Sequence, residues 1–555
     1  MPRLSLRLPF AFPPRGGVLI ALCVLYLLPG LFGHDPWKGD DLTHFGVAYS
    51  MLEDGHWLTP HLAGELWLDT PPLYHWTAAL LGWLFGSALP ILPLHDAARL
   101  ATGLYAGIFI ACLAGAARLW NGPEAARGAA LVAIGCLGLL VHAHETQPAI
   151  AFLAAAAGFY YGLALLPRQP LRGGAAAGVA LGLSFLAVGL GALVMLGPML
   201  ALLPLLSPEL RAAQARRGLS TALALTLALA LALILAAALT LVWPLALYWL
   251  EPAAFHLWWT REIADLDINA NPLRTLWNFL KLLGWFAWPA LPLALWTLWR
   301  ERRRLAEPRH LIPLVSFLIL LAAQSLFADP RGLAALPLLP PLVLLAAPAT
   351  LSLRRGAANA FDWFGMMTFT LLAGLVWLGW LAMVSGVPAQ IAKNLRRLEP
   401  GFVAAFSPLA FVIAAGISLA WLWLIFASPR APQRSAVHWA AGVTLCWGLL
   451  MALWLPAIDY DRSYRAVAVS LKAALPAQHG CIIGHGLGSP QRAAFHYFAG
   501  IKTVREGRRA ASCHLYLAEG GARREVPPPG AGWRKIWEGG RPSDRNERFR
   551  LYAKP

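Results

Sequence analysis

The sequence is dominated by apolar runs, each long enough to form a helix across a lipid bilayer. Such a helix needs about 20 predominantly apolar residues. About thirteen runs meet this requirement, and they cover residues 16–33, 96–119, 126–144, 147–166, 174–190, 191–206, 219–250, 275–299, 310–327, 332–350, 361–385, 404–427 and 437–456. The division at Gly189-Leu190-Gly191 fits a kink within one helix as well as a break between two. The chain is therefore predicted to be an all-α polytopic membrane protein.

Composition and charge agree with this class. Hydrophobic residues make up 58% of the chain and charged residues 13%, whereas soluble domains carry roughly 25% charged residues. The net charge of +17 would suggest nucleic-acid binding in a soluble protein. Here the positive charges lie mostly in short loops between apolar runs, where they determine membrane topology. The lipid bilayer is therefore an expected partner, and nucleic acid is not.

The basic residues of the loops predict the orientation of the chain. One set of loops holds Arg3, Arg7, Arg15, Arg168, Arg172, Arg211, Arg216, Arg217, Arg300 to Arg304, Arg309, Arg354, Arg355, Arg430 and Arg434. The opposite set holds fewer, namely Lys38, Arg261, Arg274, Arg331, Lys393, Arg396 and Arg397. By the positive-inside rule the N-terminus is cytoplasmic. With an odd number of spans, the tail after residue 457 then lies on the outer face.

Three segments on the outer side are long enough to carry a site: the loop 34–95, the loop 251–274 and the tail 457–555. The tail reads as an amphipathic helix at 463–475 followed by short strands at 480–484 and 514–518. Alternating helices and strands predict a small α/β domain. We therefore divide the chain into a transmembrane domain, 1–456, and a periplasmic domain, 457–555. Cys481 and Cys513 each lie beside one of the strands, and a disulfide between them fits an oxidising periplasm.

The acidic pair Asp40-Asp41 is the first candidate for chemistry. Residues 41–52 have helical character, so both carboxylates would lie at the N-cap and in the first turn. Aspartates are favoured there because they cap the helix and complement its dipole. Two carboxylates just outside a membrane are also suited to act as a general base and its support. Spacing alone favours the capping role.

An ordered set of motifs follows the acidic pair. These motifs are Met51-Leu52, Gly55-His56-Trp57, Pro60, the segment Leu68 to Trp76, and Leu84-Phe85-Gly86. In order and spacing, residues 39–86 resemble the opening signature of the polyprenyl-phosphate-dependent glycosyltransferases of the type C membrane fold. This family includes the lipid A aminoarabinose transferase and the protein mannosyltransferase-like enzymes. The rest of the chain resembles the family in architecture only.

The resemblance implies roles for residues of the first loop. Asp40 falls on the catalytic aspartate of the family, the base that activates the acceptor, and Asp41 on the neighbouring Glu. Asp69 falls on an acidic position that lies close to a bound metal in the aminoarabinose enzyme. Tyr74 and Trp76 match the aromatic pair of the substrate region.

Two departures from the family pattern concern phosphate binding. The family Lys before the paired prolines is Thr70, and the Arg after the acidic pair is Thr43. Both basic residues serve phosphate or acceptor contacts in the family, so this chain must bind phosphate through other residues.

The second loop resembles the family's aromatic segment that ends in Glu. It reads Phe255-His-Leu-Trp-Trp-Thr-Arg-Glu262. Arg261 is the candidate for the lipid phosphate, because a guanidinium binds phosphate through two hydrogen bonds. No cofactor is required by this reading. A divalent metal held by Asp69, His256 and Glu262 stays an alternative, although scattered ligands are a weak signal.

Two more segments fit the same site. Arg331, in the turn before a Leu-Pro-rich span, is a second candidate for the donor phosphate, with snorkelling at the membrane edge as the alternative. Between the predicted spans 126–144 and 147–166, relatives have an Asp before Pro, where this chain has Gln147 and, two residues earlier, Glu145. Ionisable groups at membrane depth are functional candidates, so Glu145 and His144 are expected to line the cavity.

The resemblance implies a function at the periplasmic face of a bacterial inner membrane. A sugar would move from a polyprenyl-phosphate (undecaprenyl-phosphate) donor to an envelope acceptor such as lipid A, another glycan or a protein, with inversion at the anomeric carbon. The alternative is a lipid or sugar transporter or flippase, which would predict internal repeats and ionisable residues deep within the spans. Polar residues gather instead in the outer loops, which favours an interfacial enzyme. A relative that has lost catalysis, marked by Thr43 and Thr70, is a third alternative.

Overall fold

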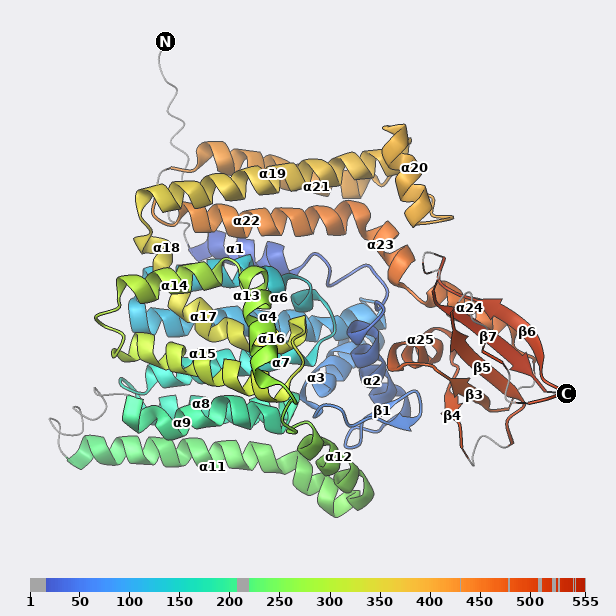
Figure 1. The fold of residues 1–555 in the computed structure, drawn as a ribbon, viewed down its shortest axis with the longest axis horizontal. Coiled ribbons are helices and arrows are strands. Elements are labelled where there is room, and N and C mark those ends of the chain that lie inside the picture. Colours follow the sequence, from blue (N-terminus) through green and yellow to red (C-terminus); the bar gives the residue numbers. More distant parts are fainter. Residues whose placement is uncertain are drawn as a thin grey trace, which may run out of the picture.

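The computed structural model describes residues 16–554, apart from 207–218, 430, 478–479, 508–511, 522–525, 528–529, 543 and 545. The helices run side by side, and a β-sheet lies at one end of them (Figure 1). Some basic residues behind the predicted orientation lie outside the described residues, namely Arg3, Arg7, Arg15, Arg211, Arg216, Arg217 and Arg430.

The prediction of a polytopic helical membrane protein is confirmed. Within the described residues, nine helices are long and apolar enough to cross a membrane, or up to eleven if each of two bent pairs forms one span. The nine are α4 (Leu94–Asn121), α7 (Pro148–Leu165), α8 (Pro170–Val188), α11 (Leu219–Leu250), α15 (Pro308–Phe327), the α16–α18 stretch (Gly332–Ser352), α19 (Arg355–Ser385), α21 (Pro408–Ala427) and the stretch Arg434–Ala474. This last stretch comprises α22 (Arg434–Leu449), η4 (Leu450–Trp454), α23 (Leu455–Arg462) and α24 (Arg465–Ala474). Two shorter apolar helices are α1 (Gly16–Leu27) and α9 (Leu190–Leu206).

Two predicted spans are bent rather than straight. The span 126–144 consists of α5 (Pro123–Gly135) and a second piece, residues 137–144, at 69°, and the span 275–299 consists of α13 (Pro272–Phe286) and α14 (Ala290–Arg300) at 101°. Pro289 separates α13 from α14, because proline lacks the N–H that would continue the helix. The two bends meet where the Leu137 N–H donates to the Trp288 carbonyl at 3.2 Å.

The ambiguous division at Gly189 is a true break. Gly189 has a φ of +79°, which ends α8. A Cβ at this position would meet the carboxylate of Glu262. Glycine is therefore required both for the left-handed backbone and for the close approach.

The loop 34–95 folds into α2 (Asp40–Asp54), a hairpin of β1 (His61–Leu62) and β2 (Glu65–Leu66), α3 (Leu73–Gly82) and a π-helical turn (Trp83–Ala88). Two further helices between spans are α12 (Pro252–Ala264) and α20 (Ala389–Leu398). All of these lie at the end of the helical body that faces the sheet (Figure 1).

The tail carries a five-stranded sheet with the strand order β4-β3-β5-β7-β6. Its elements are α24, β3 (Ile482–His485), α25 (Ser489–Ala499), β4 (Thr503–Arg505), β5 (Leu515–Gly520), β6 (Arg534–Gly539) and β7 (Arg548–Ala553). Strand β3 is parallel to β4 and β5, whereas β7 is antiparallel to β5 and β6. The predicted disulfide between Cys481 and Cys513 is present.

Candidate functional site

The two aspartates of the acidic pair have opposite environments. Helix α2 begins at Asp40, so both residues lie in its first turn, as predicted, but the N-cap is Gly39 and no side chain makes a cap hydrogen bond, so the expected capping role is wrong. Asp40 is exposed, whereas Asp41 is buried. The backbone N–H groups of Trp37 and Thr146 donate to the Asp41 carboxylate at 2.8 and 2.6 Å. Asp41 is therefore held by the protein, and Asp40 is the carboxylate that can meet a substrate.

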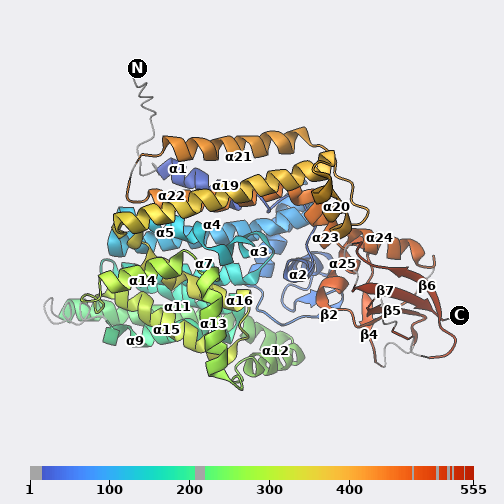
Figure 2. The ribbon, with the colours of Figure 1, turned by 45° about the horizontal axis from the view of Figure 1, so that its top comes forward.

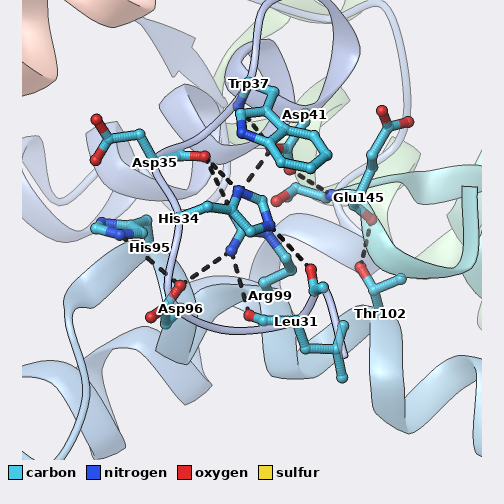
Figure 3. Close-up of polar contacts among 12 residues, drawn as sticks. Leu31, His34, Asp35, Trp37, Asp41, His95, Asp96, Arg99, Thr102 and Glu145 are labelled. Atoms are coloured by element: carbon cyan, nitrogen blue, oxygen red, sulfur yellow. Dashed lines mark hydrogen bonds and ion pairs between the residues drawn. The ribbon is translucent and has the colours of Figure 1, made fainter. Parts of the chain in front are cut away.

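The buried guanidinium of Arg99 compensates the charge of Asp41. Its Nη2 lies 3.5 Å from Asp41 and its Nη1 3.0 Å from Asp96 (Figure 3). Burial by itself raises the pKa of Asp41, but the charge of Arg99 and the two backbone N–H groups hold the pKa below its usual range. Asp41 therefore stays ionised at neutral pH.

The segment before the acidic pair is fixed by the tail. Asp35 accepts hydrogen bonds from the guanidinium of Arg465 and, at 2.6 Å, from the hydroxyl of Ser463. Asp459 accepts from the backbone N–H of Asp35 at 3.0 Å and from the indole of Trp37 at 3.1 Å. The position of Trp37, and through it that of Asp41, thus depends on residues more than 400 positions later in the chain.

Buried His34 predicts a loss of stability in acid. Burial, and then the charge of Arg99, lower the pKa of His34 from 6.5 to about 4. Between these values the unfolded chain binds a proton that the folded chain does not, so the free energy of unfolding falls as the pH drops below about 6.5. The variant His34→Gln should remove about 3 kcal/mol of this loss between pH 7 and 4, as measured by unfolding of the detergent-solubilised protein. Exposed His256→Gln is the control, and equal pH slopes for wild type and His34→Gln would contradict the prediction.

The loop between α6 (Leu137–Leu140) and α7 meets the acidic pair through its backbone. The Thr146 N–H binds Asp41, and the carbonyl of Glu145 accepts from the Thr102 hydroxyl at 2.7 Å. The Glu145 side chain is half-buried and points away from Arg99 (Figure 3), with a carboxylate oxygen 3.6 Å from His142 Nδ1. Glu145 therefore lies close to the acidic pair, and its contact with substrate stays a prediction.

Two residues expected at the substrate are buried instead. The His144 ring nitrogens lie 2.5 and 2.8 Å from the carbonyls of Leu140 and Tyr26, so this side chain ties α1 to the loop. The Tyr74 hydroxyl lies 2.6 Å from that of Thr102, and Tyr74 is fully buried. Both act on the site by holding the loop that carries Thr146.

The predicted metal ligands are not brought together. Asp69 forms an ion pair with Arg261 at 2.8 Å. Glu262 is buried and accepts from the Leu190 N–H at 2.8 Å and the Trp258 indole at 3.0 Å, and His256 is exposed on α12. In the described part of the chain, no group of three or more His, Cys, Asp or Glu side chains is placed to hold a metal ion. The geometry therefore does not support a metal site formed by these three residues. Burial raises the pKa of Glu262, and this side chain anchors the start of α9.

The ion pair between Asp69 and Arg261 joins the first loop to the second. Both side chains are half-exposed, at 57% and 42%. The Trp76 indole donates to the Trp57 carbonyl at 2.8 Å, so Trp76 supports the same part of the first loop. Arg261 is therefore a cation that solvent reaches, held over the first loop by a carboxylate.

The turn that carries Arg331 lies near the loop of Glu145. Arg331 is 81% exposed and pairs with Asp329 at 3.2 Å. A Cβ placed on the adjacent Gly332 would lie 3.3 Å from the His142 ring, which in turn faces Glu145. The structure thus brings the Arg331 turn beside Glu145.

Three buried polar atoms of the first loop have no hydrogen-bond partner among the described residues. They are the hydroxyl of Thr70, Nδ1 of His75 and the indole N–H of Trp67. His75 Nε2 lies 3.2 Å from His44 Nδ1. Burial lowers the pKa of His75 well below its usual value and that of His44 to about 4, so this pair of imidazoles is neutral at pH 7.

The sequence reasoning missed Arg99, which is fully buried at the start of α4. An ionisable residue inside an apolar run was the available signal. It also missed Asp35, Asp459 and Arg465, since sequence spacing gives no sign that residues so distant meet.

Comparisons with known proteins show the family of the chain. No family model matches the chain. It is 30% identical over 435 residues, 76% of this chain and 72% of the relative, to the undecaprenyl phosphate-alpha-4-amino-4-deoxy-L-arabinose arabinosyl transferase 1 of Pseudomonas fluorescens strain Pf-5. The corresponding transferase of Pseudomonas aeruginosa strain LESB58 is 29% identical over 451 residues, 79% of this chain and 74% of the relative.

A solved structure shows the same fold. The crystal structure of ArnT from Cupriavidus metallidurans bound to undecaprenyl phosphate matches with a TM-score of 0.68 and 17% identity, over 96% of this chain and 97% of that chain. The chain therefore belongs to the family of undecaprenyl phosphate-α-4-amino-4-deoxy-L-arabinose arabinosyl transferases, and it is a membrane glycosyltransferase.

Proposed function

We propose that this enzyme transfers 4-amino-4-deoxy-L-arabinose from undecaprenyl phosphate to lipid A at the periplasmic face of a bacterial inner membrane. The names of its relatives support the sugar and the carrier. The observation that carries the chemistry is the exposed carboxylate of Asp40 beside a buried and fully bonded Asp41. Family membership removes the support for a transporter or flippase without transferase activity.

In the proposed reaction Asp40 accepts the proton of an acceptor O–H group. The acceptor oxygen forms a bond to the anomeric carbon, the bond from that carbon to the phosphate oxygen breaks, and undecaprenyl phosphate leaves. A single displacement inverts the anomeric configuration. Asp41 supports the step by fixing the first turn of α2, which carries Asp40.

The donor phosphate is proposed to lie at Arg261 and Arg331. Arg261 has an exposed guanidinium that Asp69 already orients, and Arg331 is largely exposed beside the Glu145 loop. In the family, a Lys at the position of Thr70 supplies a phosphate contact. Here the hydroxyl of Thr70 and the ring of His75 can supply neutral hydrogen bonds to the same group, while the two arginines carry the charge.

The proposed topology has thirteen spans and a cytoplasmic N-terminus. Within the described residues, the nine apolar helices, the two bent pairs and the two shorter apolar helices would supply this number. Residues 1–456 form the transmembrane domain, and residues 457–555 form a periplasmic domain that covers the catalytic loop. The contacts of Arg492 with Glu65 at 2.6 Å and of Lys502 with Asp54 at 2.7 Å support placing loop and tail on the same face.

Reconstitution of the purified enzyme tests the proposal. Proteoliposomes with undecaprenyl-phosphate-linked 4-amino-4-deoxy-L-arabinose and lipid A should yield lipid A that is heavier by one aminopentose residue in mass spectrometry. Donor consumption without a modified lipid A would contradict the acceptor assignment. Donor that stays intact with every envelope acceptor offered would contradict the transferase assignment itself.

Removal of the Arg261 charge should weaken donor binding. We expect Arg261→Gln to raise the donor KM by about 10- to 100-fold, because a hydrogen bond to a charged group contributes about 1.5–3 kcal/mol. The KM for the acceptor should stay unchanged. Arg274→Gln, at an exposed arginine on α13, is the matched control, and an unchanged donor KM in Arg261→Gln would argue against this phosphate site.

A further inference from the structure

A dense cluster of arginines lies at the end of the helical body opposite the sheet. The segments 300–309 and 354–355 together hold seven arginines and two glutamates. The first segment follows α14, and the second follows α18 (Ala349–Ser352), which packs against α14. Figures 1 and 2 both show α14 running toward this end, away from α2 and the sheet. The cluster is therefore separate from the site proposed for sugar transfer.

Two arginines of the cluster bind backbone carbonyls at helix ends. Arg300 Nη1 donates to the Ser352 carbonyl at 2.7 Å, and Arg302 Nη1 donates to the Trp299 carbonyl at 3.1 Å. Arg300 also lies 3.8 Å from the Glu301 carboxylate. Carbonyls at the end of a helix have no partner within the helix, so these contacts explain part of the charge by structure alone.

Three further arginines have no such role. Glu307 pairs with Arg304 at 3.9 Å and with Arg309 at 2.5 Å. The arginines that are exposed and form neither an ion pair nor a hydrogen bond with another described residue are Arg303, Arg354 and Arg355. Their charges are free to meet an external anion.

Two tryptophans hold the guanidinium of Arg354. It lies 5.8 Å from the centre of the Trp296 ring and 5.4 Å from that of Trp299, within the range of about 6 Å for a cation–π contact. The Arg302 guanidinium lies over the Trp299 ring as well, at 5.5 Å. Contact with a ring occupies the face of a guanidinium and leaves its N–H edge free. This edge binds phosphate through two hydrogen bonds.

Apolar side chains continue the surface beside the two tryptophans. Leu295 and Trp299 are both exposed, and their separation of four residues places them on one face of α14. Leu351 is exposed on the neighbouring α18. A surface with cations at its end and exposed apolar side chains along the helix matches an anionic headgroup joined to acyl chains.

We propose that Arg302 and Arg354 bind the phosphate of an anionic phospholipid whose acyl chains lie along α14. In the proposed topology this lipid belongs to the cytoplasmic leaflet, opposite the face at which the sugar is transferred. The bound lipid joins the ends of α14 and α18, and it stabilises the folded protein because it binds only the folded state. The inference does not depend on the identity of the sugar, the donor or the acceptor.

Lipid binding to the full-length protein in detergent tests the inference. The probe is dioleoyl-phosphatidylglycerol, and dioleoyl-phosphatidylethanolamine is the control lipid, because it has the same chains and phosphate but no net charge. Native mass spectrometry should show tighter binding of phosphatidylglycerol to the wild type. The double variant Arg302→Gln with Arg354→Gln should weaken this binding about 25-fold, roughly fivefold for each arginine. If the double variant does not fold, Arg354→Gln alone should give the fivefold loss.

Arg118→Gln is the matched control variant. Arg118 is exposed in the last turn of α4. It lies at the same end of the molecule, since α5 follows α4 and packs against α18. We expect binding within twofold of wild type for this variant. Phosphatidylglycerol should also raise the Tm of the wild type and of Arg118→Gln, but not that of the double variant.

Three results would overturn the inference. The first is equal binding of the two lipids by the wild type, and the second is binding of phosphatidylglycerol by folded Arg354→Gln as tight as by the wild type. The third is displacement of phosphatidylglycerol by inorganic phosphate, which would show a site for the free anion in place of a lipid. An equal loss in Arg118→Gln and Arg354→Gln would have the same consequence, because it would indicate a general effect of net charge.

Discussion

Asp40→Asn should reduce kcat by about 10²- to 10⁴-fold, the usual contribution of a general base, with little change in either KM. The carboxylate is exposed at the start of α2, and the amide is nearly isosteric, so the helix and its contacts should persist. What is lost is the group that takes the proton of the acceptor. Single-turnover transfer in proteoliposomes measures the effect directly.

Asp54→Asn is the matched control for this experiment. Asp54 ends the same helix and pairs with Lys502 at 2.7 Å on the surface. An exposed pair contributes roughly 0–1 kcal/mol, so activity within about twofold of wild type is expected. If Asp40→Asn stays as active as Asp54→Asn, another group must serve as the base, and the role that the motif assigns to Asp40 is wrong.

The helical spans were predictable because every helix that crosses the bilayer needs a long apolar run. The predicted span 147–166 corresponds to α7, Pro148–Leu165, and the predicted span 310–327 to α15, Pro308–Phe327. The two bent pairs were missed for a local reason, since an apolar run that contains Pro289 or Cys136 has the same hydrophobicity whether it is straight or bent. A bend forms where backbone groups leave the helical hydrogen-bond pattern. Tertiary contacts determine which groups these are.

The site was predictable only in its motif-bearing part. Asp40 and Asp41 follow from the ordered signature, but the contrast between an exposed and a buried carboxylate arises from Trp37, Thr146 and Arg99. Thr146 lies 105 positions from Asp41, and nothing in its local sequence marks it. Only the folded structure shows that two residues so far apart in the sequence are in contact.

The metal alternative shows the opposite error. Asp69, His256 and Glu262 were grouped because their residue types match metal ligands, yet the carboxylate of Glu262 is buried against α9 and that of Asp69 pairs with Arg261. Each side chain already has a partner of its own. Residue type identifies what a group can bind, while geometry decides whether several groups share one ligand.

Arg99→Met should destabilise the folded protein by about 3–5 kcal/mol, as expected when one partner of a buried ion pair is removed. Arg99 is fully buried, and it faces the carboxylates of Asp41 and Asp96 and the carbonyl of Leu31. Without the guanidinium, two carboxylates remain in a site that water does not reach. Reversible unfolding of the purified protein in mixed micelles measures the difference.

Arg127→Met isolates the effect of burial. Arg127 pairs with the carboxylate three residues before it at 3.0 Å, as Arg99 does with Asp96, but its side chain is 29% exposed. We expect a loss below about 1 kcal/mol for this surface pair. The combination Arg99→Met with Asp41→Asn should recover part of the loss, because one uncompensated charge is removed along with its partner. Equal destabilisation by Arg99→Met and Arg127→Met would show that Asp41 does not depend on Arg99, and that its two backbone N–H groups suffice to hold the charge.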